Sequence, residues 1–221
     1  MDRKKLIKIE IFQPKACYTT PLSFKGIETF PLPPYSTLRG MIYTAMGRKY
    51  REGDEIDFSI QGKYESIYRD YWTAIKFGDD GKDKKPIEVP TLHNLKLIIH
   101  IWTNIGDEIV EALNSPAEFL SLGRREDIIK IEKVKEIGFT EKDMDEAKKS
   151  LILRNNCYIP KDLELDIRGI YYRLPSFWEI KNGYRVFTQM KDVFYVEEPV
   201  IIEKGKIYID DEGDPIWLKL T

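Results

Sequence analysis

The order of strand-like and helix-like patterns over residues 1–136 is the feature that most constrains the fold of this chain. Residues 6–12 alternate apolar and polar side chains, which predicts a strand with one buried face, and residues 56–60 repeat this alternation. Between them, residues 36–47 carry apolar side chains at helical spacing, with Ser36 as the predicted N-cap and Gly47 as the predicted stop. The chain therefore begins with a strand, a helix and a second strand.

The pattern continues with a strand over residues 95–102, a helix over 107–113 and a strand over 128–134. Taken together, the elements follow the β-α-β-β-α-β order of the ferredoxin-like (RRM-like) arrangement. We therefore expect an α+β fold with a ferredoxin-like domain over residues 1–138.

An inserted β-hairpin is expected within this domain, at about residues 66–92. Aromatic residues (Tyr68, Tyr71 and Trp72) lead into the polar, glycine-containing segment 78–86. Such a segment is typical of the tip of a long hairpin.

Residues 139–221 predict a second, small and mainly antiparallel β domain. Thr140 and Asp143 favour a short helix over residues 141–150. Strand-like runs follow at residues 167–174, 185–188, 193–196, 200–203, 206–209 and 216–220. Gly183, Gly205 and Gly213 mark turns between these runs.

Composition excludes several classes of protein. The net charge of −2 excludes a uniformly basic nucleic-acid binder of the histone type. Cys17 and Cys157 lie far apart, which excludes a disulfide framework and a Cys-x-x-Cys zinc site. The most apolar run, residues 95–102, is shorter than the ~20 residues of a membrane helix, and the polar start of the chain does not resemble a signal peptide. We expect a soluble, cytoplasmic protein with no membrane contact.

The positive charge is concentrated at one end of the chain. Residues 1–50 hold nine basic and three acidic residues together with seven aromatic ones, while the remainder is acidic. Basic residues interleaved with aromatic rings are typical of proteins that bind single-stranded nucleic acid. The ordinary alternative, which the charges alone favour, is that the rings belong to the core and the cations to a solvated surface.

Motifs for nucleotide binding or hydrolysis are absent from the sequence, so we expect no cofactor, no metal and no catalytic residue. The acidic run at residues 210–214 lacks the glycine position and the final glutamate of an EF-hand, and we interpret it as a hairpin turn. The two histidines are also weak candidates for catalysis. His100 lies in an apolar strand and is expected to be structural. His93 lies near the end of the hairpin and is a less favoured candidate for a general base in RNA cleavage.

Two segments carry a family resemblance. Residues 18–41 contain Tyr18-Thr19-Thr20-Pro21 and then the run Glu28 to Met41, and residues 122–126 read Leu-Gly-Arg-Arg-Glu. In combination they resemble the CRISPR-associated RAMP proteins of the fifth Cas family, most closely the type I-B branch. Weaker matches lie at residues 170–175, 185–187 and 213–218.

The resemblance implies a ferredoxin-like domain with a hairpin "thumb" and a small C-terminal β domain. It implies a subunit of the Cascade surveillance complex that caps the 5′ handle of the CRISPR RNA (crRNA). The thumb would press against a backbone subunit and another face against the large subunit, with target DNA met only in the assembled complex.

The resemblance and the residue chemistry together point to a set of candidate RNA-binding residues. A helix start can bind phosphate through its free N–H groups, and arginine suits bidentate recognition of phosphate or guanine. The RNA-binding candidates are Lys25, Ser36, Thr37, Arg39, Gly40, Tyr43, Gly123, Arg124 and Arg125. The candidates for thumb or partner contact are Tyr71, Trp72, Lys76, Lys82, Lys84, Lys85 and His93.

Catalysis is not expected. Relatives that cleave RNA use a tyrosine, a lysine and a histidine, and their Lys-His pair has no counterpart here, since His93 follows Leu92 and His100 follows Ile99. The preferred hypothesis is a non-catalytic RNA-capping subunit. Two alternatives stay open: a metal-independent endoribonuclease that processes CRISPR repeat RNA, and a scaffold that contacts only protein.

Overall fold

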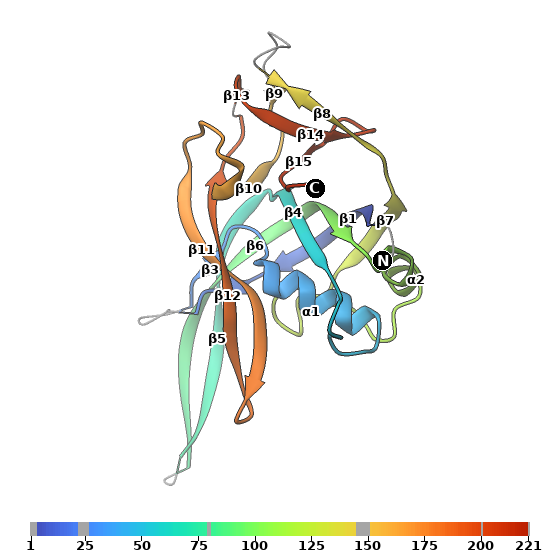
Figure 1. Cartoon of the computed structure of the whole chain (residues 1–221). Helices are drawn as coiled ribbons and strands as arrows, with labels where there is room; N and C mark the ends of the chain where they lie inside the picture. Colours follow the sequence, from blue (N-terminus) through green and yellow to red (C-terminus); the bar gives the residue numbers. More distant parts are fainter. Residues whose placement is uncertain (1–3, 22–26, 79–80, 145–150, 200, 221) are drawn as a thin grey trace.

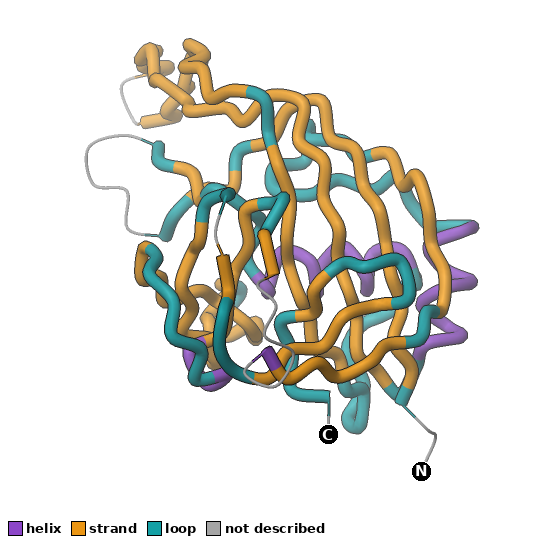
Figure 2. Tube along the Cα trace, turned by 90° about the horizontal axis from the view of Figure 1, so that it is seen from above, coloured by secondary structure: helices purple, strands orange, loops and turns teal. Residues whose placement is uncertain are grey.

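A computed structural model describes residues 4–21, 27–78, 81–144, 151–199 and 201–220, and the chain is built around one large antiparallel sheet (Figure 1). The order of the strands is β11-β12-β10-β4-β6-β1-β7, and β5 pairs with β6. These strands are β1 (Lys5–Ala16), β4 (Ile56–Lys63), β5 (Ser66–Gly78), β6 (Gly81–Thr103), β7 (Lys130–Glu136), β10 (Asn156–Pro160), β11 (Ile170–Lys181) and β12 (Tyr184–Val196). Figure 2 shows the long strands of the sheet running side by side across the molecule.

The first part of the chain has the predicted order of elements. β1, helix α1 (Tyr35–Ala45), β4, β6, helix α2 (Gly106–Asn114) and β7 follow one another, and their strands form the consecutive set β4-β6-β1-β7. The short strands β2 (Tyr18–Thr19) and β3 (Thr29–Phe30) pair in the connection before α1.

The predicted N-cap of α1 is wrong by two residues. Pro34 occupies the cap position, without a side-chain hydrogen bond, and Ser36 is buried inside the first turn. Proline suits a helix start because its fixed φ is compatible with the helix and its missing N–H costs nothing there. The predicted end is confirmed, since Gly47 follows the helix with φ +61°, and a Cβ at Gly47 would lie 2.9 Å from Cβ of Ala117.

Alternation along β1 explains how the sheet is covered on two faces. Ile7, Ile9 and Ile11 are at most 1% exposed and belong to the main core with residues of α1 and α2. Lys8 points to the opposite face and is also buried. The sheet is therefore packed on one side by helices and on the other by a polar, C-terminal layer.

A β-hairpin lies at the expected position, but it is not separate from the strand that follows. β5 and β6 pair from Ser66 with His93 to Gly78 with Gly81, and β6 continues without a break to Thr103 as one strand of 23 residues. Asn94 adopts a left-handed φ of 48° at the point where the hairpin enters the sheet. Asparagine tolerates this conformation better than most residues, so the strand can bend without ending.

The C-terminal third departs from the sequence prediction. Residues 139–143 form strand β8 (Phe139–Asp143), in which Thr140 pairs with Ile209 of β14 (Lys206–Asp210), so the helix predicted over residues 141–150 is wrong over residues 141–143. Pairing with a neighbouring strand outweighs the local helix signal of a segment this short. Residues 145–150 lie outside the described part of the chain.

The main sheet also runs past the expected boundary at residue 138. β10 pairs with β4, and the long β11–β12 hairpin pairs with β10, so these strands extend the first sheet instead of forming a unit of their own. Among the described strands after residue 138, only shorter ones lie apart from it: β8, β14 and β15 (Pro215–Ile216) form one small sheet, and β9 (Leu151–Ile152) and β13 (Ile201–Ile202) form another.

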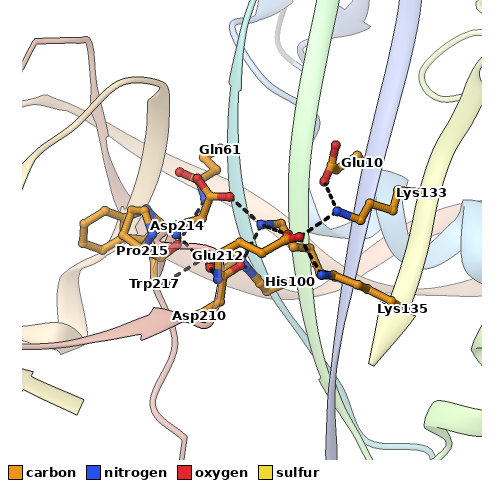
Figure 3. A network of polar contacts seen from close by, with 12 residues as sticks. Glu10, Gln61, His100, Lys133, Lys135, Asp210, Glu212, Asp214, Pro215 and Trp217 are labelled. Atoms are coloured by element: carbon orange, nitrogen blue, oxygen red, sulfur yellow. Dashed lines mark hydrogen bonds and ion pairs between the residues drawn. The ribbon is translucent and has the colours of Figure 1, made fainter. Parts of the chain in front are cut away.

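A buried polar network joins the C-terminal layer to the main sheet (Figure 3). The ammonium of Lys8 donates to Asp210 at 2.7 Å and pairs with Asp214 and Glu212, while Nε2 of His100 lies 3.0 Å from Oδ2 of Asp210. Burial acts to lower the pKa of Lys8, but these three carboxylates outweigh burial and raise it. The acidic run is thus a turn, as predicted, and its carboxylates bind protein cations.

The turn itself closes through backbone hydrogen bonds. The N–H of Asp210 donates to the carbonyl of Asp214, and Gly213 adopts a φ of +95°. Across the described residues, no group of three or more His, Cys, Asp or Glu could hold a metal ion, and no helix is long and apolar enough to cross a membrane.

Candidate nucleic-acid interface

The loop at residues 122–127 is a tight turn that closes through its own backbone. The N–H of Leu122 donates to the carbonyl of Asp127, and the N–H of Asp127 donates to the carbonyl of Arg124. Gly123 has a φ of +106°, and a Cβ there would lie 3.0 Å from the carbonyl oxygen of Cys17. Glycine is therefore required at this position by the protein's own backbone packing.

Asp127 organises this turn, and sequence reasoning missed it. Its carboxylate is fully buried and accepts hydrogen bonds from the backbone N–H of Cys17 at 3.0 Å and of Arg124 at 3.2 Å. It also accepts two bonds from the guanidinium of Arg124, at 2.9 and 2.8 Å. The only signal in the sequence is an aspartate three residues after the arginine of a glycine turn.

Arg124 joins the turn to the base of the β5–β6 hairpin. Its guanidinium carbon lies 4.6 Å from the centre of the Trp72 ring, a cation–π distance. Partial burial acts to lower the pKa of Arg124, and its bonds to Asp127 outweigh that effect and raise it. Arg124 is thus a charged residue with an internal partner on each side, and it also lies 3.5 Å from Glu126.

Arg125 has a different environment. It is exposed, and within the described chain it forms no ion pair and no side-chain hydrogen bond. The structure therefore separates two neighbouring arginines that the sequence treats alike: Arg124 is held by the protein, and Arg125 is available to a ligand.

One face of the hairpin base gathers aromatic, cationic and imidazole groups beside this turn. Lys15 of β1 and Ser66 of β5 both pair with His93, so these residues share a face of the sheet. Tyr68 is 40% exposed and its ring centroid lies 6.2 Å from that of His93. Trp72 follows on the same face because side chains of a strand repeat every two residues. We call Lys15, Tyr68, Trp72, His93, Arg124 and Arg125 the loop–hairpin site.

The remaining thumb candidates lie elsewhere on the hairpin. Tyr71 is 70% exposed on the opposite face, where its hydroxyl donates to Glu88. Lys84 and Lys85 are exposed on the outer part of β6. Lys76 and Lys82 belong to the two strands, but their side chains lie outside the described set, and Lys25 lies outside the described residues altogether.

The candidates on α1 are mostly held inside the protein. The guanidinium of Arg39 donates to the carbonyls of Ile56 at 2.8 Å and Ser176 at 3.3 Å, and lies 5.3 Å from the centre of the Phe177 ring. Burial lowers the pKa of Arg39. The side chain therefore ties α1 to β4 and β11.

Tyr43 is likewise buried, and its hydroxyl donates to Asp54 at 3.2 Å. Burial, followed by the nearby Asp54 carboxylate, raises the pKa of Tyr43 to about 12. This ring is part of the core surface between α1 and the following loop.

The start of α1 is also closed to a ligand at two positions. Ser36 is buried, and the backbone N–H of Thr37 donates to the carbonyl of Pro34 at 3.0 Å. Gly40 is the open position, since a Cβ there would meet nothing within 4 Å. That these residues bind RNA stays a prediction, and the geometry places the accessible chemistry at the loop–hairpin site instead.

The solved structures that are similar to this chain include two of CRISPR proteins. One, described as a "CRISPR RNA-guided surveillance complex", covers 90% of this chain and 91% of its own with a TM-score of 0.60 at 14% identity. The other, a CRISPR protein from Archaeoglobus fulgidus, covers 98% and 100% with a TM-score of 0.54 at 12% identity. At these identities the likeness shows a shared fold. A search of curated protein sequences finds no match.

A family model identifies the chain itself. The model described as CRISPR-associated protein (Cas_Cas5) matches residues 6–192, which include α1, the whole hairpin and the turn at residues 122–127. The resemblance seen in the sequence is thereby confirmed over most of the chain. The chain belongs to the Cas5 family of CRISPR-associated proteins.

Proposed function

We propose that this chain is a non-catalytic, crRNA-binding subunit of a type I CRISPR surveillance complex, which caps the 5′ handle of the guide RNA. The observation that carries the proposal is the loop–hairpin site, where Arg125 is free beside the Arg124–Trp72 pair and the exposed ring of Tyr68. Cations that meet phosphates beside rings that stack on bases are the chemistry of single-stranded RNA binding.

The fold supports this role in a second way. The elements β1, α1, β4, β6, α2 and β7 follow the β-α-β-β-α-β order expected of a ferredoxin-like domain, and we infer that the β5–β6 hairpin is the thumb inserted into it. The hairpin extends beyond the sheet (Figure 1). A projecting hairpin whose base carries the RNA site can contact the RNA on one face and a backbone subunit on the other, where Tyr71 is exposed.

The partners follow from the family and the similar complex. We infer that a backbone subunit meets the thumb, that the large subunit meets another face, and that target DNA is encountered only in the assembled complex. The similar solved structure is described as an RNA-guided surveillance complex, which supports this assignment.

The test is a footprint of the guide RNA. The complex is reconstituted with and without this chain, and the RNA is probed with hydroxyl radicals. Protection of the 5′-terminal nucleotides only when the chain is present supports capping. An identical footprint without the chain, in a complex that still assembles, would instead support a scaffold that contacts only protein.

One observation favours a second candidate function, a metal-independent endoribonuclease. Lys15 and His93 are directly opposite each other on β1 and β6, and Tyr68 lies against His93, so a tyrosine, a lysine and a histidine meet although they are far apart in the sequence. Repeat RNA incubated with the pure protein in EDTA distinguishes the two functions. Specific cleavage that is lost in His93→Ala supports the nuclease, and intact RNA supports the non-catalytic role.

A further inference from the structure

The β11–β12 hairpin carries a second exposed face that the loop–hairpin site does not include. Residues on this face are found from pairing: Trp178 pairs with Phe187, Ile180 with Arg185, and Tyr171 with Phe194. Phe177, the neighbour of Trp178, points the other way, toward α1, where it contacts Tyr50 and Arg39. The face that bears Trp178 is therefore turned away from α1.

This outward face is covered only near the sheet. At its base, Val196 and Phe194 pack into a smaller hydrophobic cluster that includes Ile207 and Trp217 of the C-terminal layer. Farther out, Tyr171 is 51% exposed and Phe187 38% exposed, and all residues of the outer turn from Lys181 to Met190 are exposed. An isolated two-stranded hairpin is only marginally stable in water. An exposed face that carries several aromatic rings is typical of an interaction site.

Arginines are interleaved with these rings. The guanidinium carbon of Arg185 lies 4.4 Å from the centre of the Trp178 ring, and among the described residues Arg185 has no ion-pair partner. Arg173 lies on the same face, 69% exposed, at 4.0 Å from Asp192. Asp192 is the carboxylate of this face, and it accepts a hydrogen bond from the hydroxyl of Tyr171.

Charge decides which class of partner fits. Residues 170–196 hold four basic and two acidic residues, whereas the rest of residues 151–221 hold six basic and ten acidic ones. The ribbon is thus a positive element in the otherwise acidic C-terminal third of the chain, and two of its four basic residues, Arg173 and Arg185, lie on the outward face. Phosphates complement this charge, and bases stack on tyrosine, tryptophan and phenylalanine rings.

We propose that the outward face of the β11–β12 hairpin, formed by Tyr171, Arg173, Trp178, Arg185 and Phe187, is a second binding surface for single-stranded nucleic acid. We call it the ribbon platform. It deepens the proposed function and rests on it, because it adds a second contact for a bound strand, on the face of the sheet opposite the loop–hairpin site. Both hairpins extend from the sheet toward the same end of the molecule (Figure 1).

The experiment measures binding of fluorescein-labelled 20-nucleotide probes, oligouridylate RNA and oligothymidylate DNA, to the full-length protein by fluorescence anisotropy. Phe187→Ala and Arg185→Gln remove a ring and a cation of the platform. Val186→Ala and Lys181→Gln are matched controls, since Val186 is 40% exposed and both residues lie on the opposite face of the same ribbon. Thermal melting of all four variants verifies that they are folded.

Each platform variant is expected to weaken binding about fivefold or more, as for the loss of one stacked base, while each control changes it less than twofold. Tighter binding of the RNA probe assigns the platform to guide RNA, and tighter binding of the DNA probe assigns it to a target strand. Ultraviolet cross-linking is expected to attach the probe to Trp178 or Tyr171.

Each of the following results would overturn the proposal. Platform variants that bind like the wild type exclude the surface, and controls that weaken binding equally show only general attraction between charges. Platform variants that bind the probes normally but no longer co-purify with the other subunits identify a protein interface. If Arg125→Ala abolishes binding while the platform variants bind normally, the ribbon platform is excluded but the proposed function stands. If the wild-type protein binds neither probe, both the ribbon platform and the proposed function are excluded.

Discussion

The guanidinium of Arg124 lies against the ring of Trp72, with 4.6 Å between its carbon and the ring centre. This contact joins the turn after α2 to the base of a hairpin that begins much earlier in the chain. The buried carboxylate of Asp127 holds the guanidinium in place from the other side. The position of the free Arg125 therefore depends on a pair of residues that do not themselves need to touch RNA.

Replacing Asp127 by alanine is expected to destabilise the protein by about 3–5 kcal/mol, the cost of removing one partner of a buried ion pair. The change also leaves the backbone N–H of Cys17 without its acceptor. Urea denaturation measures the loss. Glu126→Ala removes an exposed carboxylate next to it and should change stability by less than about 1 kcal/mol. Equal midpoints for the two variants would contradict the role of Asp127.

Arg125→Ala is expected to weaken binding of repeat RNA without lowering stability, because the side chain has no partner within the described protein. If it contacts one phosphate, the slope of log affinity against log salt becomes smaller by about 0.7. Anisotropy titrations at several salt concentrations give the slope. Arg51→Ala, which removes an exposed arginine from the loop after α1, is the control, and an unchanged slope in both variants would exclude a phosphate contact at Arg125.

Arg39→Met should destabilise the fold by about 1.5–3 kcal/mol, since the guanidinium donates to two backbone carbonyls that the methionine leaves without a donor. At temperatures where the variant is folded, its affinity for RNA should equal that of the wild type. A variant with normal stability and weak RNA binding would instead show that Arg39 contacts the RNA.

Lys8→Met is expected to cost about 3–5 kcal/mol, because Asp210 is left as a buried carboxylate without its cation. Lys133→Met provides the comparison: Lys133 binds the same turn through Glu212 but is exposed, so its loss should destabilise the protein much less than the loss of Lys8. Guanidinium denaturation separates the two. Similar losses for both variants would show that burial of the Lys8–Asp210 pair is unimportant.

Acid should weaken attachment of the C-terminal layer. Burial acts to raise the pKa of Asp210, but the bonds from His100 and Lys8 outweigh it and hold that pKa well below its ordinary value, while three lysines lower the pKa of Glu212 to about 2. A carboxylate with a depressed native pKa contributes stability above its unfolded pKa and loses it as pH falls, here between about pH 5 and pH 2. Lys8 stays protonated throughout this range.

The free energy of unfolding, measured from pH 7 to pH 2, tests this expectation. The wild type should lose stability steeply at the acid end, whereas Asp210→Asn should be less stable at neutral pH and change less with acid. A variant with the same acid dependence as the wild type would show that other carboxylates are responsible.

Local patterns in the sequence predicted a large part of the fold. Three features depend only on residues a few positions apart and can therefore be predicted without the tertiary structure. They are the alternation of β1, the apolar stripe of α1 and the turn at Gly213. The β5–β6 hairpin and the glycine turn before Arg124 were visible for the same reason, and so was the family.

The C-terminal strands show where prediction from local sequence patterns fails. Residues 141–143 belong to a predicted helix but form part of a strand, and β10 to β12 join a sheet whose other strands lie within residues 5–136. A short segment takes the conformation that satisfies its backbone hydrogen bonds, and the strand that offers them lies far away in sequence.

The sequence alone determined the order of elements over residues 1–136, the hairpin, the family and which residue types could meet RNA. Only the tertiary structure decided which of those residues are free. Arg39 is bound to carbonyls of β4 and β11, Arg124 to Asp127 and Trp72, and Lys8 to a turn about two hundred residues away, while Arg125 is left exposed. The reason is that a cation's partners are set by which distant strands meet when the core is buried, and no local spacing encodes that meeting.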